Sequence, residues 1–223
     1  MAKTPSASSN AVLVVGLGRF GSAVALSLTR LGHEVLGIDK SPELVQEWSE
    51  RLTHVIEADS TNADTLQRLG ACEFQHAVVG IGSDLEASVL SVLALSELGV
   101  PDIWAKAISD KHGRILERTG ANHVIYPEAT MGERVAHLVT GKMIDFIEFD
   151  DGFAIVKTRA PEEAIGKTLA ASALRSKYGI TIVGVKSPMA DFTYATPQTM
   201  VEPGDLLIVS GPTSQVEKFA SIT

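Results

Sequence analysis

Several features that mark other classes of protein are scarce in this sequence. It holds one cysteine, Cys72, among 223 residues, so no disulfide can form within the chain, which fits a reducing compartment. Its apolar runs are far shorter than the roughly 20 residues that a membrane-spanning helix needs. Acidic residues outnumber basic ones, the net charge is −8, and no basic stripe is visible. This balance argues against nucleic acid as a partner and against docking on anionic lipid.

Residue patterns that support catalysis are also scarce. The sequence has no Walker-type lysine loop, no Cys/His cluster with metal-ligand spacing and no nucleophile elbow. Four of its six histidines lie just before or at the start of predicted strands, where they would face the end of the sheet away from a ligand. They are His33, His54, His76 and His123. His112 could face a ligand, but no acidic partner stands at a recognisable spacing. We therefore expect a protein that is not an enzyme.

A regular alternation of apolar, β-rich runs with helical patterns is what the sequence does contain. Six strands are predicted, at residues 11–15, 34–39, 54–59, 76–82, 102–107 and 123–127, with helices between them. Short loops between alternating strands and helices indicate parallel strands joined by right-handed crossovers. The expected fold class is α/β, a Rossmann-like doubly wound parallel sheet, with ligands beyond the carboxyl ends of its strands.

After the sixth predicted strand the pattern changes. A longer helix is predicted from Met131 to about Ile147. Short strands follow at 153–158, 181–186 and 206–209, with short helices near 167–175 and 214–220. We expect a disordered lead-in at residues 1–10, which lacks the apolar stretch of a secretory signal. A nucleotide-binding domain at 11–147 and a small α+β domain at 148–223 would follow it.

The most informative motif follows the first predicted strand. Gly16-Leu17-Gly18-Arg19-Phe20-Gly21 matches GxGxxG, whose glycines permit a tight turn, close approach of backbone to a diphosphate, and close packing of helix on strand. The next helix would direct its positive end at the phosphates. Asp39 ends the second strand, where an acid normally binds a ribose hydroxyl, and Lys40 follows it. This arrangement favours an unphosphorylated ribose over NADP; glycines used only for packing are the alternative.

Further candidates end the third and fourth predicted strands, on the same rim of the sheet. Asp59 and Ser60 stand where the edge of an adenine would lie, although Asp59 could equally cap the helix that follows. Gly80 and Gly82 could let the backbone approach a ligand, or they could serve tight packing. The sequence leaves these alternatives open.

Segments spread along the chain resemble the KtrA/TrkA family of regulatory subunits of bacterial potassium transporters, most closely KtrA. In the first half they are GLGRFG…GHEVLGID, IWAKA at 103–107 and VIYPEATMG at 124–132. In the second half they are ALRSKYGITIVGVK at 173–186 and EPGDLLIVSG at 202–211. The two halves resemble RCK domains, regulators of potassium conductance, and the resemblance covers nearly the whole chain after residue 10.

The resemblance implies a function for the chain and a role for several residues. The protein would be cytoplasmic and peripheral on the inner face of the membrane, where homodimers assemble into an octameric ring on a potassium channel subunit of the Ktr/Trk type. ATP and ADP, or NAD(H), would bind the Rossmann site. By position, Gly16, Gly18 and Gly21 hold the phosphates, Asp39 holds the ribose, and Arg19 reaches the terminal phosphate across a dimer interface.

The resemblance also implies a cation site. Glu128, in the Tyr-Pro-Glu motif, would help to bind Mg²⁺ or Ca²⁺ near the ATP phosphates, and Lys106 would lie close to them. The simpler alternatives are a surface arginine at position 19, a helix cap at 128 and a solvated lysine at 106. Some relatives bind cyclic di-AMP in the second domain, but no residue set here establishes that. Ala58-Asp59 departs from the Ala-Asn that KtrA-like sequences often carry.

Two other functions compete with this interpretation. A small NAD-dependent oxidoreductase would need a proton donor and a substrate pocket in residues 148–223. That segment offers Lys177, Tyr178 and Lys186 but no recognisable proton relay. A redox-sensing repressor would need a basic helix that reads DNA, and the sequence shows none.

Overall fold

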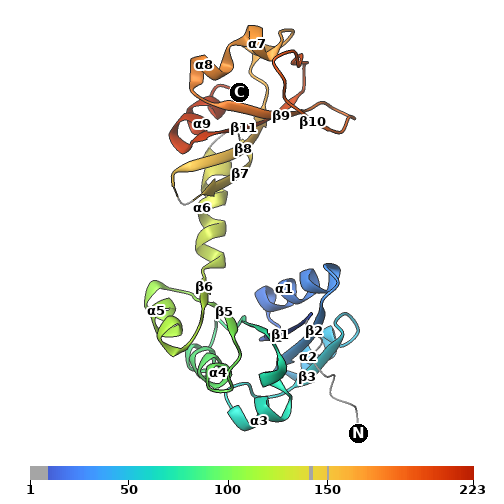
Figure 1. The fold of residues 1–223 in the computed structure, drawn as a ribbon, viewed down its shortest axis with the longest axis vertical. Coiled ribbons are helices and arrows are strands. Elements are labelled where there is room, and N and C mark those ends of the chain that lie inside the picture. The colour runs from blue at the N-terminus through green and yellow to red at the C-terminus, as the bar shows by residue number, and fades with distance from the viewer. Residues whose placement is uncertain (1–9, 141–142, 150) are drawn as a thin grey trace. The chain divides into compact units, whose positions relative to one another are not determined.

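The computed structural model describes residues 10–140, 143–149 and 151–223, so the predicted lead-in lies outside the described residues except for Asn10. The chain forms two compact units, Met1–Glu128 and Ala129–Thr223, each with its own sheet and its own core (Figure 1). In the described parts of the chain, no helix combines the length and the apolar character needed to cross a membrane.

Six parallel strands form the sheet of the first unit, in the order β3-β2-β1-β4-β5-β6. The strands are β1 (Ala11–Val15), β2 (Glu34–Asp39), β3 (His54–Glu57), β4 (His76–Val79), β5 (Asp102–Lys106) and β6 (His123–Ile125). The helices are α1 (Arg19–Arg30), α2 (Pro42–Trp48), α3 (Ala63–Arg68), η1 (Ala71–Glu73), α4 (Leu85–Glu97) and α5 (Asp110–Thr119). The predicted Rossmann-like sheet is confirmed, and its strand order reverses between β1 and β4, where such folds form a crevice.

β1 is apolar at every position because helices cover both faces of the sheet. Leu13 and Val15 belong to a core that includes residues of α3, α4 and α5. Val12 and Val14 belong to a second core that includes residues of α1 and α2. Each fully buried valine or leucine contributes about 1.5–3 kcal/mol, so the two cores hold β1 firmly and place the glycine loop after it.

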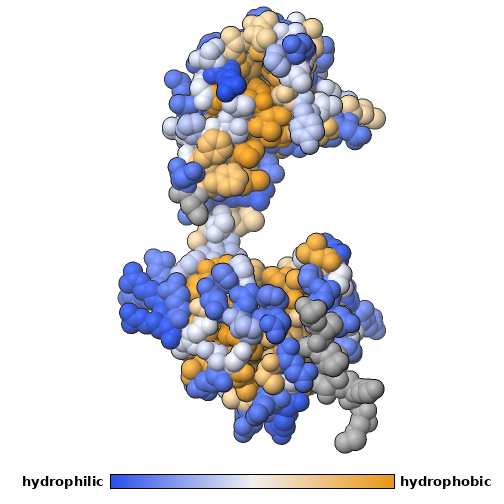
Figure 2. Space-filling view, viewed as in Figure 1, coloured by the Kyte–Doolittle hydropathy of each residue, from blue (hydrophilic) through white to orange (hydrophobic). Residues whose placement is uncertain are grey.

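The second unit is a small α+β domain, as predicted, built on an antiparallel sheet in the order β10-β9-β11-β8-β7. Its strands are β7 (Met143–Phe149), β8 (Phe153–Arg159), β9 (Thr181–Lys186), β10 (Phe192–Tyr194) and β11 (Leu206–Pro212). Its helices are η2 (Glu162–Ala164), α7 (Leu169–Ser172), α8 (Leu174–Tyr178) and α9 (Thr213–Ala220). α6 (Pro127–Thr140) precedes them. Figure 2 shows apolar residues gathered on the visible face of this unit. The exposed apolar residues of the unit include Ile147, Phe149 and Phe153.

The prediction of one helix from Met131 to about Ile147 is wrong. α6 ends at Thr140, and Met143–Phe149 forms β7, an edge strand paired antiparallel with β8. The sequence of β7, MIDFIEF, is rich in aromatic and β-branched residues, and the strand buries Met143 and Phe146 in the core of the second unit. The boundary predicted between residues 147 and 148 therefore falls inside this strand.

Candidate nucleotide-binding site

A cleft of about 500 Å³ opens at the carboxyl ends of the central strands of the first unit. Most of the predicted nucleotide-binding residues line it: Gly16, Gly18, Asp39, Lys40, Asp59, Ser60, Gly80 and Gly82. Leu44 and Leu90 add apolar surface to the lining. The cleft thus lies where the strand order reverses, the place at which open α/β sheets bind their ligands.

The three motif glycines have different physical roles in this cleft. Gly16 has φ +87°, a conformation that favours glycine, and starts the turn out of β1. A Cβ on Gly21 would lie 1.8 Å from the carbonyl oxygen of Gly16, so α1 can pack this close only without a side chain there. A Cβ on Gly18 would meet nothing within 4 Å. Gly18 therefore leaves open the space that a ligand would fill.

The amino-terminal end of α1 faces the cleft without a capping side chain. Gly18 is the N-cap residue, and the first turn of α1 holds no acidic residue. The first N–H groups of a helix lack partners within the helix, and its dipole places partial positive charge there. Because Gly18 lines the cleft, this helix end is arranged to bind an anion such as a diphosphate.

Asp39 joins the glycine loop to the start of α2. Its Oδ2 accepts a hydrogen bond of 2.7 Å from the N–H of Leu17, and its Oδ1 accepts one of 2.9 Å from the N–H of Ser41. The hydroxyl of Ser41 in turn accepts a hydrogen bond from the N–H of Leu44 and caps α2. Each carboxylate oxygen can accept more than one bond. Asp39 can therefore hold the loop in place and still accept ribose hydroxyls.

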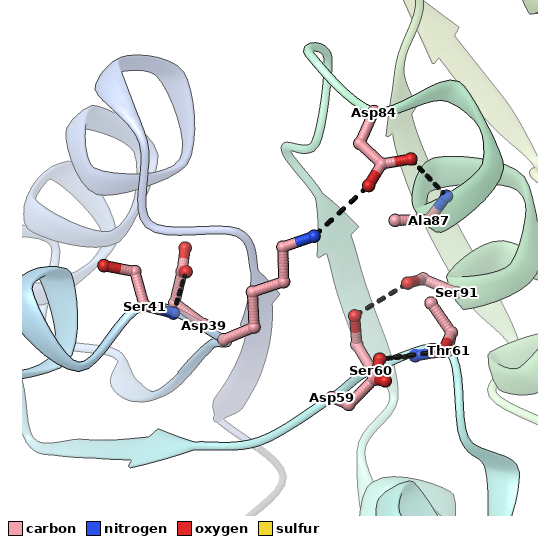
Figure 3. Close-up of polar contacts among 9 residues, drawn as sticks. Asp39, Ser41, Asp59, Ser60, Thr61, Asp84, Ala87 and Ser91 are labelled. Carbon is pink, nitrogen blue, oxygen red and sulfur yellow. Dashed lines mark hydrogen bonds and ion pairs between the residues drawn. The ribbon is translucent and has the colours of Figure 1, made fainter.

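An ion pair joins loops that lie after different strands along the cleft (Figure 3). Lys40 Nζ lies 3.2 Å from Asp84 Oδ2, while Asp84 Oδ1 accepts a hydrogen bond from Ala87 and caps α4. The bond from Ala87 and the bond from Lys40 hold the pKa of Asp84 below its usual value. Asp84 was not predicted as a site residue. An aspartate between a predicted strand and a helical pattern is a sequence signal for a helix N-cap, and this signal could have placed Asp84 on the same rim of the sheet.

Asp59 and Ser60 both line the cleft but have local partners. Asp59 Oδ1 accepts hydrogen bonds from the backbone and the hydroxyl of Thr61, and these lower the pKa of Asp59 (Figure 3). The hydroxyl of Ser60 is buried and lies 2.7 Å from that of Ser91 on α4. The alternative role of Asp59 as the cap of α3 is wrong, because Asn62 caps that helix.

A second group of predicted residues meets at the ends of β5 and β6. Lys106 Nζ lies 2.5 Å from Glu128 Oε1 and 5.7 Å from the centre of the Phe20 ring. The hydrogen bond from Lys106 holds the pKa of Glu128 below its usual value, and the charge of exposed Arg19 adds to the effect. Glu128 also stands in the first turn of α6. The structure thus brings these four predicted residues together.

The histidines take no part in the cleft as the structure describes it. His54, His76 and His123 are the first residues of their strands and His33 directly precedes β2, as predicted. His112 is buried on α5, its Nδ1 lies 3.4 Å from the N–H of Ile108, and burial lowers its pKa. It therefore does not serve as an exposed proton donor beside a ligand.

Comparisons with known proteins cover nearly the whole chain. The TrkA-N domain matches residues 12–127 and the TrkA-C domain matches residues 153–223. Ktr system potassium uptake protein C of Bacillus subtilis (strain 168) is 35% identical over 207 residues, which cover 92% of this chain and 94% of that protein. Ktr system potassium uptake protein A of the same organism is 33% identical over 207 residues, which cover 92% of this chain and 93% of that protein.

Solved structures support the fold. The RCK domain of GsuK has a TM-score of 0.68 at 20% identity and covers 98% of this chain, which spans 48% of that one. The GsuK channel bound to NAD has a TM-score of 0.65 at 19% identity, with 95% of this chain and 39% of that chain covered. Both family domains match in order, and the similarity to the Ktr proteins covers 92% of the chain. The chain therefore belongs to the family of Ktr and Trk potassium uptake proteins built from TrkA-N and TrkA-C domains.

Proposed function

We propose that the chain is a regulatory subunit that binds an adenine nucleotide and gates a bacterial potassium channel or transporter from the cytoplasmic face of the membrane. One observation carries the proposal: the glycine loop, the open end of α1 and Asp39 converge on one cleft. This cleft belongs to a chain that is similar to Ktr potassium uptake proteins over 92% of its length.

The lining of the cleft supports a particular orientation of the nucleotide. Phosphates would bind the amino-terminal end of α1, the ribose would bind Asp39, and the base would lie against Leu44 and Leu90. A carboxylate at the ribose disfavours the 2′-phosphate of NADP, because like charges repel. ATP and ADP, or NAD and NADH, remain the proposed ligands; among the fold relatives, GsuK structures are described as bound to NAD and to ADP.

Arg19 is proposed to distinguish ATP from ADP. It is exposed at the first residue of α1, beside the glycine loop. A guanidinium can pair with a terminal phosphate through two parallel hydrogen bonds, and ADP lacks the third phosphate. Arg19→Ala is expected to weaken ATP binding about tenfold or more, which corresponds to the loss of one hydrogen bond to a charged group. It should weaken ADP binding much less. Isothermal titration calorimetry of both nucleotides measures the two losses.

Arg30 provides the control for Arg19, because it stands at the opposite end of the same helix and carries the same charge. Arg30→Ala should leave both affinities unchanged. Equal losses of ATP and ADP affinity in Arg19→Ala would reject the assignment.

Self-association is the other part of the proposal. Homodimers would assemble into an octameric ring on a membrane channel subunit of the Ktr/Trk type. Met131, Val135 and Val139 support this, since they recur every four residues on α6 and all three are exposed. An apolar stripe on a helix is usually covered by another protein surface. A mass in solution several times the 23.7 kDa of the chain is expected from light scattering.

Thermal-shift titration tests the function directly, because a ligand that binds only the folded state raises stability. The ligands to titrate are ATP, ADP, NAD and NADH, with NADP as the analogue that should bind least. Cyclic di-AMP is titrated as well, to test whether the second unit binds a ligand. Stabilisation by cyclic di-AMP that persists in Asp39→Ala would assign that ligand outside the cleft. If no adenine nucleotide raises the melting temperature, the proposal fails.

The second unit gives little support to the competing hypothesis that the chain is an oxidoreductase. Lys177 and Tyr178, two of the residues that this segment could offer for catalysis, both contact the carboxylate of Glu163. The three side chains form a surface cluster on α8 and η2. A regulatory protein is therefore the better supported candidate.

A further inference from the structure

A cavity of about 690 Å³ lies wholly within the second unit. Its walls come from the carboxyl ends of β8 and β9, the start of β11, and residues 187–189 of the hairpin between β9 and β10. The apolar part of the lining consists of Ile144, Ala160, Pro188, Met189 and Leu206. None of the residues that were predicted to bind nucleotide or metal lines this cavity, so it is separate from the proposed nucleotide site.

Two cationic side chains stand in one row across the sheet at this cavity. Arg159 on β8 and Lys186 on β9 both lie opposite Leu206 on β11, the strand between them. Cross-strand neighbours project from the same face of a sheet, and two strand spacings put the two backbones about 10 Å apart. Lys186 Nζ donates a hydrogen bond of 3.0 Å to the carbonyl of Ala190, which is neutral and leaves the charge unmatched. An anionic group bound over Leu206 can therefore meet both cations and relieve their repulsion.

A buried carboxylate belongs to the same lining. Asp205 is 1% exposed, and its Oδ2 accepts a hydrogen bond of 2.8 Å from the N–H of Glu202. Its Oδ1 is buried and has no hydrogen-bond partner in the part of the chain that the structure describes. Such an oxygen normally has a partner, because an unpaired buried charge is costly. Within the described residues no group of three or more His, Cys, Asp or Glu side chains could hold a metal ion, so the positive donor that suits Asp205 is an ammonium.

We propose that this cavity binds a small zwitterion with an apolar body, such as an apolar α-amino acid. The carboxylate of the ligand pairs with Arg159 and Lys186, its ammonium donates to Asp205, and its apolar body packs on Leu206. The charges of the lining select against simpler ligands. An anion without an ammonium is repelled by the Asp205 carboxylate, and an amine without a carboxylate is repelled by the two cations. The inference does not depend on the proposed binding of nucleotide by the first unit.

Met189 supports a ligand with an apolar body. This residue lies in the hairpin between β9 and β10 with φ +64°, a left-handed conformation that residues other than glycine seldom adopt. Its side chain is fully exposed, and it lines the cavity. Backbone held in such a conformation occurs often at sites that clamp ligands. A methionine side chain adapts to apolar groups of different shape, so we expect the cavity to accept several apolar amino acids.

Free leucine is the probe, and two analogues each lack one of its charged groups. The analogue 4-methylpentanoate has no ammonium, and 3-methylbutylamine has no carboxylate. Isothermal titration calorimetry of the full chain should detect leucine at millimolar concentrations. Each analogue should bind about tenfold more weakly or worse, because one hydrogen bond between charged groups is lost. If leucine, methionine and phenylalanine all fail to bind, or if either analogue binds as tightly as leucine, the proposal is wrong.

The exposed cations are tested by Arg159→Met and Lys186→Met. Each variant should weaken leucine binding about tenfold, through loss of one charged contact, and should not weaken the binding of 3-methylbutylamine. Lys157→Met is the matched control, since Lys157 lies two residues before Arg159 on β8, carries the same charge and does not line the cavity. Its affinity for leucine should equal that of the wild type. An equal loss in Lys157→Met would overturn the proposal, because the effect would then reflect the charge of the whole sheet face.

Asp205→Asn tests the contact with the ammonium. Asparagine keeps the shape of the side chain but loses the charge, so this variant should bind leucine and 4-methylpentanoate with nearly equal affinity. A preference for leucine as large as in the wild type would overturn the role of Asp205. Circular dichroism establishes first that the variant folds, because Asp205 is buried. If it does not fold, the analogues on the wild type and the two exposed variants still decide the proposal.

Discussion

Gly21→Ala is expected to destabilise the first unit by about 3 kcal/mol or more, as severe overpacking does. The new Cβ would lie 1.8 Å from the carbonyl oxygen of Gly16. That oxygen is a backbone atom, so no flexible side chain can move aside. The N–H of the same residue, Gly16, donates a hydrogen bond to the carbonyl oxygen of Ile38 on β2, which holds the turn in place. Gly80 closes the other side, since a Cβ on Gly80 would lie 3.1 Å from Gly21 Cα. Chemical denaturation followed by circular dichroism measures the loss.

Gly18→Ala is the matched control for Gly21→Ala. A Cβ at Gly18 meets nothing within 4 Å, and its φ of −63° and ψ of −174° suit alanine. We expect a change in stability within about 0.5 kcal/mol, as for most surface substitutions. Nucleotide binding should nevertheless weaken, because the methyl group occupies the space where a diphosphate would approach. If the two variants were equally stable, the close contact between α1 and β1 would be refuted.

Asp39→Ala is expected to weaken ADP binding by about 1.5–3 kcal/mol, or roughly ten- to a hundredfold, through loss of a charged hydrogen bond to the ribose. The variant also leaves the N–H groups of Leu17 and Ser41 without their acceptor, which loosens the glycine loop. Asp39→Asn separates the two effects, because the amide keeps one acceptor oxygen and the shape of the side chain but loses the charge.

Isothermal titration calorimetry with ADP tests Asp39, and Asp59→Ala provides the comparison. Asp59 lies on the same cleft, but its carboxylate is bonded to Thr61 and not to the glycine loop. The loss in Asp59→Ala should be much smaller than in Asp39→Ala. If Asp39→Ala keeps the ADP affinity of the wild type, the assignment of Asp39 as the residue that binds the ribose is wrong.

The sequence was sufficient for the parts of the fold that depend on local signals. β1 and β2 have the predicted bounds, 11–15 and 34–39, because continuous apolar runs ended by glycine or by charged residues mark buried parallel strands. The glycine loop between them joins a strand to a helix, so its turn and its contact with Asp39 follow from neighbouring elements. β9 also has its predicted bounds, 181–186.

Other parts depend on contacts that the sequence does not reveal. β10 is a short strand whose residues are all exposed, so it carries no burial pattern. Lys106 and Glu128 were both expected near the phosphates, but their contact with each other was not predicted, because it requires knowing that β5 and β6 pair side by side. The Lys40–Asp84 pair likewise joins loops after β2 and β4, which are neighbours of β1 and not of each other.

The central position of β1 also determines the order in which the chain can fold. Val12 of β1 pairs with Val35 on one side but with His76 on the other, so the strand stays half covered until β4 has been made. In the second unit, Phe149 of β7 pairs with Phe153 of β8, a few residues away, but the other edge of β8 pairs with β11, where Phe153 lies opposite Pro212. Pairing between distant segments slows folding and exposes strands to association with other chains. β1 and β8 are therefore each left half covered until a distant strand has been made, and these strands are the ones that most need protection during synthesis.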